Sequence, residues 1–227
     1  MRDYAALKAA VDTGVDQLGR LDIIVANAGI GNGGDTLDKT QRRQTGTDMI
    51  DVNLGGVWKT VKAGVPHLLS GGRGGSVILT SSVGGLKAYP HVGHYVAAKH
   101  GVVGLMRTFA VELGQHNDPS QHRAPHRTCS TPMIMNEAPG KCSGPTWRTP
   151  GPDDMAPICQ LFHVLPIPWV DPIDISNAVL FFASDESALS HRRRPSPIDA
   201  GSCLEVARGL SRSCRSRRDG TQSPRSG

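Results

Sequence analysis

The sequence has few of the features that would place it in a membrane or in an oxidising compartment. Its 227 residues contain no apolar run long enough to span a bilayer, and the first residues do not follow the layout of a signal peptide. The five cysteines include no C-x-x-C pair and form no even disulfide framework. We therefore expect no membrane partner, a reducing, cytoplasmic setting, and one domain as the default for this length.

Aromatic residues are also scarce, at 4% of the chain, and none lies in the basic C-terminal part. From position 191 onward the chain has nine arginines and three acidic residues, a net charge of +6, whereas the first 190 residues carry 16 basic and 17 acidic side chains. A basic tail can bind nucleic acid, but stacking on bases needs aromatic side chains. We therefore do not expect a nucleic-acid partner, and we predict a domain over 1–190 and a disordered, Arg/Ser-rich tail over 191–227.

Helical and strand patterns alternate along the first part of the chain. Amphipathic spacing and capping residues predict helices over 3–18, 48–69, 94–113 and 171–184. The predicted apolar face of the first helix includes Leu18, and that of the second includes Ile50. Short, nearly all-apolar runs over 21–26 and 76–80 predict strands that are buried on both faces of a parallel sheet. This alternation indicates an α/β fold with a doubly wound parallel sheet.

A serine and a Tyr-x-x-x-Lys pair follow the second strand run. Ser82 comes just after the strand, and Tyr95 and Lys99 lie four residues apart at the head of the next helix. Residues four apart share one helix face, so their side chains can meet. Such a group suits acid–base chemistry at an alcohol or ketone, although a tyrosine and a lysine at this spacing usually have no special role.

Small and amide side chains follow the first strand run. Asn27-Ala28-Gly29 ends that strand with residues that let a ligand approach the backbone closely, and Asn53 lies early in the next helix. Taken by itself, Asn53 could equally be a polar helix residue bonded to a neighbouring strand.

In this order and register, the Asn27-Ala28-Gly29 turn, Asn53, Ser82 and the Tyr95-x-x-x-Lys99 pair resemble the short-chain dehydrogenase/reductase family. The amino-acid sequence of the matching segments is similar to the actinobacterial, mycofactocin-associated or carveol-dehydrogenase-like branch. Those segments cover residues 2–116, 131–137, 150–187 and 198–204.

The resemblance implies a Rossmann-type fold and an oxidoreductase that transfers a hydride between NAD or NADP, with NAD favoured, and a secondary alcohol or ketone. A homo-tetramer through the helices at 48–69 and 94–113 is implied as well. The segment 150–172 would cover the substrate. Residues that would line an apolar pocket for a hydrophobic or terpenoid alcohol, or equally pack against the core, are Met133, Met155, Phe162 and Trp169.

Roles for single residues follow from the same resemblance. Tyr95 would be the general base in alcohol oxidation, Lys99 would lower its pKa and hold the nicotinamide ribose, and Ser82 would orient the substrate oxygen. Asn53 would hold a water molecule in the proton relay. The residues implied to bind the cofactor are Asn27, Ala28, Gly29, Tyr95, Lys99 and Thr131.

No metal ion is expected. His122, His126 and Cys129 could imitate a metal site, but they fall in the segment 117–130, where the resemblance lapses. It lapses again over 138–149 and 188–197, and we hypothesise that local reading-frame shifts produced these segments.

Relative to the family pattern, the chain begins after the first strands and the glycine-rich loop that holds the cofactor pyrophosphate. We therefore expect a sheet without its first strands, in which the strand at 21–26 has an unpaired apolar edge. The alternative is that the chain is a catalytically inactive remnant, truncated or altered by reading-frame shifts, or a binding protein that acts through its basic tail. A titration with NAD(H) or NADP(H) distinguishes the two.

Overall fold

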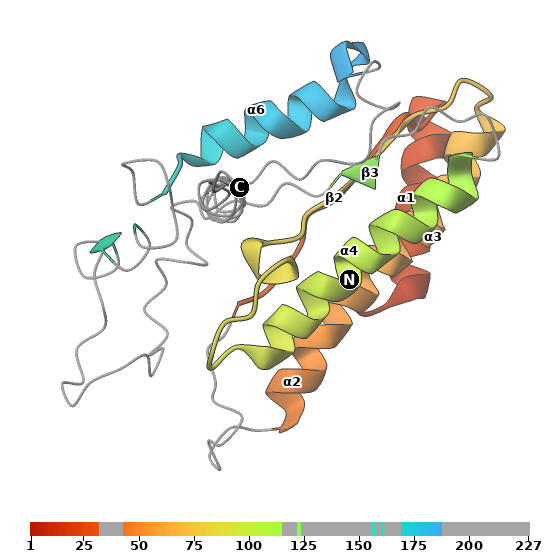
Figure 1. Cartoon of the computed structure of the whole chain (residues 1–227). Helices are drawn as coiled ribbons and strands as arrows, with labels where there is room; N and C mark the ends of the chain where they lie inside the picture. Colours follow the sequence, from red (N-terminus) through yellow and green to blue (C-terminus); the bar gives the residue numbers. More distant parts are fainter. Residues whose placement is uncertain (32–42, 115–121, 124–155, 158–159, 161–168, 188–227) are drawn as a thin grey trace, which may run out of the picture.

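The computed structural model describes residues 1–31, 43–114, 122–123, 156–157, 160 and 169–187. Three strands in this part of the chain form one parallel sheet in the order β1-β2-β3 (Figure 1). The strands are β1 (Ile23–Ala26), β2 (Ser76–Leu79) and β3 (His122–Arg123). Ile23 lies opposite Ser76, and Val77 lies opposite His122, so β2 is the central strand of the three.

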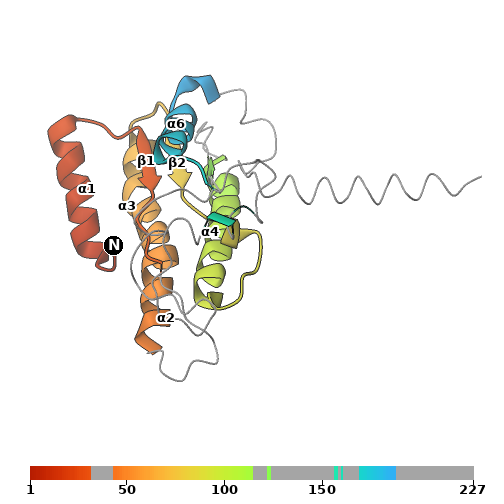
Figure 2. The same ribbon diagram turned by 90° about the vertical axis from the view of Figure 1, so that its left-hand side faces the viewer.

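Helices lie on both faces of this sheet (Figures 1 and 2). They are α1 (Tyr4–Leu18), α2 (Arg43–Ile50), α3 (Gly56–Ser70), α4 (Gly93–Gly114) and α6 (Pro172–Ala183). The connections from β1 to β2 and from β2 to β3 place α3 and α4 on the same face, as successive parallel crossovers of one hand do. On the opposite face α6 packs against β2, whereas α1 lies outside α3.

Two predicted helices are confirmed together with their caps. Asp3 accepts a hydrogen bond from the Ala6 N–H at 3.0 Å at the start of α1, which ends at Gly19 with a left-handed φ of 77°. At the start of α6, Asp171 and Asp174 form a capping box around Pro172.

Polar contacts join α3 to the outer helix α1 and to the residues before it. His67 Nε2 lies 2.8 Å from Asp12 Oδ1, and Lys59 Nζ donates to the Arg2 carbonyl oxygen at 2.6 Å. No residue of α1 is buried, and Leu18, predicted to lie on its apolar face, is 78% exposed. The prediction is wrong at Leu18 because α1 ends there without a partner surface among the described residues.

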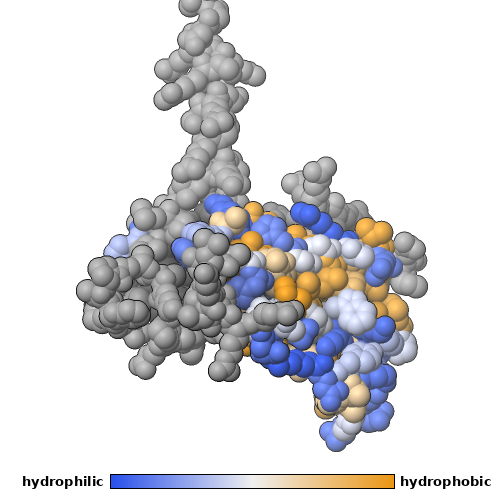
Figure 3. Space-filling model, turned by 90° about the horizontal axis from the view of Figure 1, so that it is seen from below, coloured by the Kyte–Doolittle hydropathy of each residue, from blue (hydrophilic) through white to orange (hydrophobic). Residues whose placement is uncertain are grey.

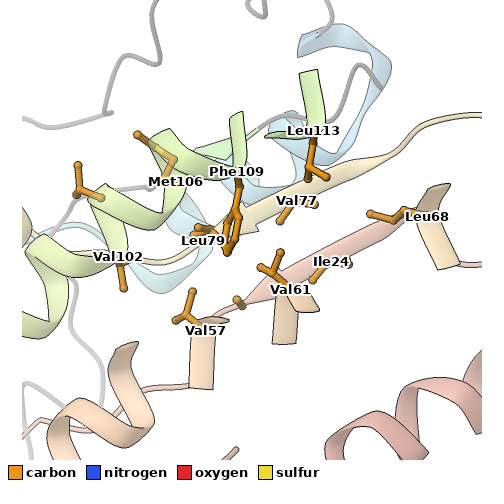
Figure 4. Packing of buried hydrophobic residues seen from close by; sticks show 12 residues of the cluster. Ile24, Val57, Val61, Leu68, Val77, Leu79, Val102, Met106, Phe109 and Leu113 are labelled. Carbon is orange, nitrogen blue, oxygen red and sulfur yellow. The ribbon is translucent and has the colours of Figure 1, made fainter. Parts of the chain in front are cut away.

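The core lies between the sheet and the helices α3 and α4 (Figure 4). Its buried residues are Ile24, Ala26, Val57, Val61, Leu68, Val77, Leu79, Val102, Val103, Met106, Phe109 and Leu113. On the face seen in Figure 3, the described part of the surface carries apolar side chains between charged ones. None of the helices in the described ranges is long and apolar enough to cross a membrane.

The two main strands differ in how they are covered. Residues 77–79 of β2 are fully buried, as predicted for a strand between two layers. In β1 only Ile24 and Ala26 are buried, whereas Ile23 and Val25 are 43% and 41% exposed. The prediction that this strand is buried on both faces is therefore wrong, because β1 is the edge strand and α6 packs over β2 instead.

The predicted helix over 48–69 is longer and less regular than its apolar spacing suggested. It begins at Arg43 as α2 and passes through a π-helical turn, Asp51–Gly55, into α3. Before this turn the buried residue is Met49, while Ile50, predicted to face the core, is 37% exposed. The wider turn adds one residue, so the buried face lies one position earlier than a regular helix would place it.

The short strand β3 corrects a second expectation. Residues 117–130 show no strand pattern in the sequence, yet His122 and Arg123 pair in parallel with β2. Backbone pairing beside a central strand does not require apolar side chains in so short a segment. The predicted tail over 191–227 and the atypical segment over 138–149 lie outside the described residues.

Glycines at close backbone contacts give a first testable prediction. A Cβ on Gly75 would overlap the Asp22 carbonyl oxygen and approach Leu68 Cδ2 to 2.5 Å, whereas nothing lies within 4 Å of a Cβ on Gly104 in α4. Gly75→Ala should lower the free energy of unfolding by about 1–3 kcal/mol, and Gly104→Ala should raise it by about 0.5–1 kcal/mol. Urea denaturation of both variants checks this; equal effects would contradict the close contact of Gly75 with Asp22.

Candidate active site

The site lies where the carboxyl ends of β1 and β2 meet. β1 ends at Ala26 and β2 at Leu79, and these two residues lie opposite each other in the sheet. The Thr80 N–H donates to the Ala26 carbonyl oxygen at 3.1 Å, which continues the pairing one residue further. In open α/β sheets ligands bind outside the carboxyl ends of the strands, so the turns that follow are the place to look.

The structure brings Ser82, Tyr95 and Lys99 together. Lys99 Nζ lies 5.7 Å from the centroid of the Tyr95 ring, one turn earlier in α4, and Ser82 is near enough to the Tyr95 phenol to influence its pKa. Ser82 opens a short 3₁₀ turn, and its Oγ accepts from the Gly84 N–H at 3.1 Å. A Cβ on Gly84 would lie 3.3 Å from Tyr95 Cε1, so the absence of a side chain lets the ring pack on this turn.

Lys99 is almost closed off from solvent. Its side chain is buried, with 5% of the residue exposed, and Nζ donates to the Thr80 carbonyl oxygen at 2.9 Å. A second bond holds the helix backbone at this point, because Ser81 Oγ donates to the Lys99 carbonyl oxygen at 2.9 Å. Lys99 is therefore fixed from both of its ends against the residues that follow β2.

Burial shifts the two titratable groups in opposite senses. It lowers the pKa of Lys99 from its usual 10.5 to about 8, and it raises the pKa of the Tyr95 phenol above its usual 10.0. The neighbouring Ser82 opposes the shift in the Tyr95 pKa but has the smaller effect. Near neutral pH Lys99 is thus mainly charged and Tyr95 protonated, and forming the phenolate needs further positive charge in the site.

Asn53 is fully buried in the π-helical turn and bonds the loop that follows β1. Its Oδ1 accepts from the Ile30 N–H and its Nδ2 donates to the Ile30 carbonyl oxygen, both at 2.8 Å. A Cβ on Gly29 would lie 2.9 Å from Asn53 Oδ1 and 3.8 Å from Lys99 Nζ. The pair of bonds holds Asn53 so close to the loop that only glycine fits at position 29, beside Lys99.

The other residues of the predicted turn lie at the same sheet edge. Asn27 and Ala28 are exposed, and Asn27 Oδ1 accepts a hydrogen bond from Thr80 Oγ1 at 3.0 Å. The carboxamide of Asn27 and the ammonium of Lys99 thus both bond to Thr80.

Sequence reasoning missed three residues of this arrangement, namely Ile30, Thr80 and Ser81. Ile30 contributes only backbone groups, so its side chain gave no signal. Thr80 and Ser81 interrupt an apolar strand run with two hydroxyl groups directly before Ser82, and this was a usable signal.

Some predicted residues cannot be placed. Thr131, Met133, Met155 and Phe162 lie outside the described residues, whereas Trp169 is half-buried. In the ranges that the structure covers, no group of three histidine, cysteine or acidic side chains could hold a metal ion.

His94 is the remaining polar side chain near the site. Its Nε2 is buried and has no hydrogen-bond partner among the described residues, and burial lowers its pKa. Nothing in the described part of the chain assigns it a role in the chemistry.

Comparison with known proteins gives a consistent result. A family model described as short chain dehydrogenase matches residues 1–139. The chain is 65% identical over 205 residues to a short-chain type dehydrogenase/reductase of Mycolicibacterium smegmatis, a match that covers 90% of this chain and 72% of the relative. It is 46% identical over 209 residues to the (−)-trans-carveol dehydrogenase of Rhodococcus erythropolis, covering 90% of this chain and 73% of that enzyme.

A solved structure agrees with these relatives. The carveol dehydrogenase of Mycobacterium avium in complex with NAD superimposes with a TM-score of 0.80 at 62% sequence identity. The superposition covers 89% of this chain and 72% of that one.

The buried ammonium gives a prediction about stability. Because the pKa of Lys99 is lowered to about 8 from 10.5, the folded chain binds fewer protons than the unfolded chain between these values, and stability must rise with pH there. Lys99→Met removes this effect. Between pH 8 and 10.5, the free energy of unfolding of the original chain should gain up to about 3 kcal/mol relative to the variant.

Urea denaturation at several pH values in this window measures the difference. The matched control is Lys62→Met, which replaces an exposed lysine that lies over the Trp58 ring. A Lys99→Met variant whose stability follows pH in parallel with the original chain would contradict the burial of a charged amine.

Proposed function

Because the chain belongs to the short-chain dehydrogenase family, whose model matches more than half of it, we propose that it oxidises hydrophobic secondary alcohols to ketones with NAD and catalyses the reverse reaction. The fold is the Rossmann-type α/β fold of that family, and the activity class is NAD(P)-dependent oxidoreductase. The observation that carries the proposal is the group of Ser82, Tyr95 and Lys99 at the carboxyl ends of β1 and β2.

The described residues fit the nicotinamide and ribose end of such a cofactor. The Gly29 backbone lies beside Lys99, since a Cβ on Gly29 would be 3.8 Å from Nζ, and the exposed Asn27 and Ala28 continue this surface along the turn. Lys99 Nζ can keep its bond to the Thr80 carbonyl oxygen and donate its other hydrogens to ribose hydroxyls, since an ammonium group has three donors. When bound, NAD would supply a hydride acceptor for the carbinol carbon and positive charge near Tyr95.

In this proposal the side chains of the chain handle the proton. Ser82 donates a hydrogen bond to the substrate oxygen, and the Tyr95 phenolate accepts the hydroxyl proton as the carbon–oxygen double bond forms. Lys99 stabilises the phenolate electrostatically. In ketone reduction the protonated Tyr95 returns the proton to the same oxygen, and its raised pKa keeps it protonated near neutral pH.

Asn53 has two roles in the proposed mechanism. Its carboxamide fixes the loop through Ile30, so that the surface for the cofactor is formed in advance. We also assign to Asn53 the water molecule of the proton relay, as the family resemblance implies. Thr131, which would approach the nicotinamide amide, remains part of the proposal from family resemblance alone.

The substrate class rests on the relatives. The enzyme of Rhodococcus erythropolis and the structure from Mycobacterium avium are both carveol dehydrogenases, and carveol is a hydrophobic, cyclic secondary alcohol. The NAD in the second of these favours NAD over NADP for this chain. We therefore propose carveol-like terpenoid alcohols as the first compounds to test.

A tyrosine variant tests this function. Tyr95→Phe should reduce kcat for carveol oxidation by about 100-fold or more, because the general base is lost. The dissociation constant for NAD should rise by no more than about tenfold, since only one of the implied cofactor contacts is lost and Lys99 is unchanged. Absorbance of NADH gives the rate, and calorimetry gives the binding.

The control is Tyr4→Phe, which removes a phenolic hydroxyl group at the start of α1, outside the site. Loss of activity in this control would show that the assay reports folding. A Tyr95→Phe variant with a tenth or more of the original kcat would overturn the assignment of Tyr95, and absence of NAD and NADP binding by the unaltered chain would overturn the dehydrogenase proposal.

We further propose a homo-tetramer formed through α3 and α4. Trp58 on α3 and Val111 on α4 are 42% and 67% exposed, which is a large exposure for apolar side chains on neighbouring helices. Light scattering should give four times the mass of a single chain, and Trp58→Glu should shift the distribution toward smaller species. A monomer at all concentrations would contradict this.

A further inference from the structure

Thr80 uses all three of its polar groups at the sheet edge. Its N–H donates to the Ala26 carbonyl oxygen, its carbonyl oxygen accepts from Lys99 Nζ at 2.9 Å, and its Oγ1 donates to Asn27 Oδ1 at 3.0 Å. The backbone bonds belong to any residue at this position. The hydroxyl bond requires a threonine or serine, so it is the one of these three hydrogen bonds that depends on the side chain.

The hydroxyl bond fixes which end of the Asn27 carboxamide is free. With Oδ1 bonded to Thr80, Nδ2 and its two N–H groups are the remaining polar part of the side chain. No residue in the described part of the chain accepts a hydrogen bond from this Nδ2. Asn27 is exposed and directly precedes Ala28 and Gly29, and the Gly29 backbone lies beside Lys99.

We propose that Thr80 is a positioning residue for the dinucleotide. Its hydroxyl holds the Asn27 carboxamide in the orientation that directs Nδ2 toward an acceptor oxygen of the bound cofactor, a ribose or phosphate oxygen. This inference rests on the proposed function, because it assigns Asn27 and Thr80 to the same cofactor. Without the hydroxyl, the carboxamide can rotate or present Oδ1, which repels such oxygens.

Packing alone does not explain a threonine at this position. The preceding residues 77–79 are apolar and fully buried, and valine has nearly the same shape as threonine and equal preference for strands. Thr80 itself is half-buried, so a valine would fit and would keep both backbone bonds, including the acceptor for Lys99. Thr80→Val therefore removes one hydrogen bond while it preserves the support of the Tyr95–Lys99 pair.

The experiment measures NAD binding to the full chain by isothermal titration calorimetry, with carveol oxidation as a second readout. Thr80→Val should raise the dissociation constant for NAD about three- to tenfold, the usual effect of one lost hydrogen bond. Thr80→Ser, which keeps the hydroxyl, should restore binding to within about twofold of the original. The loss in kcat/KM should come mainly from the KM for NAD, and the pH profile of kcat should keep its shape.

A double-mutant cycle tests whether Thr80 acts through Asn27. Asn27→Ala should weaken NAD binding at least as much as Thr80→Val, and adding Thr80→Val to Asn27→Ala should have no further effect. The matched control is Thr60→Val in α3, where a half-buried threonine donates to the Gly56 carbonyl oxygen at 2.7 Å, away from the site. Binding by this control should equal that of the original chain.

The outcomes separate the two proposals. If the original chain binds NAD and Thr80→Val binds it equally well, or if Thr80→Ser fails to restore binding, the role of Thr80 is wrong and the dehydrogenase proposal stands. Additive effects of the Thr80 and Asn27 variants would also overturn the inference. If the original chain binds no dinucleotide, both proposals fail. Should Thr80→Val unfold, Asn27→Ala and Thr80→Ser still decide the question.

Discussion

The ammonium group of Lys99 lies where almost no water reaches it, so it must have an acceptor from the protein, and the Thr80 carbonyl oxygen is that acceptor. This one bond ties α4 to the end of β2. Tyr95, one turn earlier on α4, is thereby held over the residues that follow the strand, next to Ser82. The relative position of helix and sheet, and with it the whole site, depends on satisfying a charge that is costly to bury. The lowered pKa of Lys99 is the measure of that cost.

Small residues make these approaches possible. A Cβ on Gly85 would overlap Ser81 Oγ and lie 2.8 Å from the Lys99 carbonyl oxygen, and one on Gly101 would lie 2.8 Å from the Leu54 side chain. The turn after β2 and the π-helical turn before α3 can therefore reach the backbone of α4 directly. Gly29 does the same for the loop after β1, at Asn53. Each of the three glycines lies at a contact between two elements that carry site residues, so the geometry of the site and the close packing of the fold are set by the same positions.

The sequence predicted the local features well. Apolar spacing and caps placed α1, α4, α6 and β2, and the register of Ser82 with the Tyr95–Lys99 pair identified the family. What could not be predicted depends on contacts between distant segments. The pairing of Asn53 with the Ile30 backbone spans 23 positions, and the Thr80–Asn27 bond spans 53. Neither has a local pattern. One face of β1 is exposed because α6 covers β2 instead. Met49 is buried in place of Ile50 because the π-helical turn shifts the buried face of the helix.

That irregular turn has a consequence for how the chain can change. Each residue of an α-helix advances the side-chain direction by about 100°, so one additional residue in a turn rotates everything before it relative to everything after it. α2 and α3 therefore form one continuous helix in which the turn at Asp51–Gly55 rotates the side chains of α2 relative to those of α3. α3 can keep its fixed orientation toward the core while α2 presents a different side to whatever lies beyond it. An insertion or deletion before this turn would therefore change what α2 faces and leave Asn53 and α3 in place.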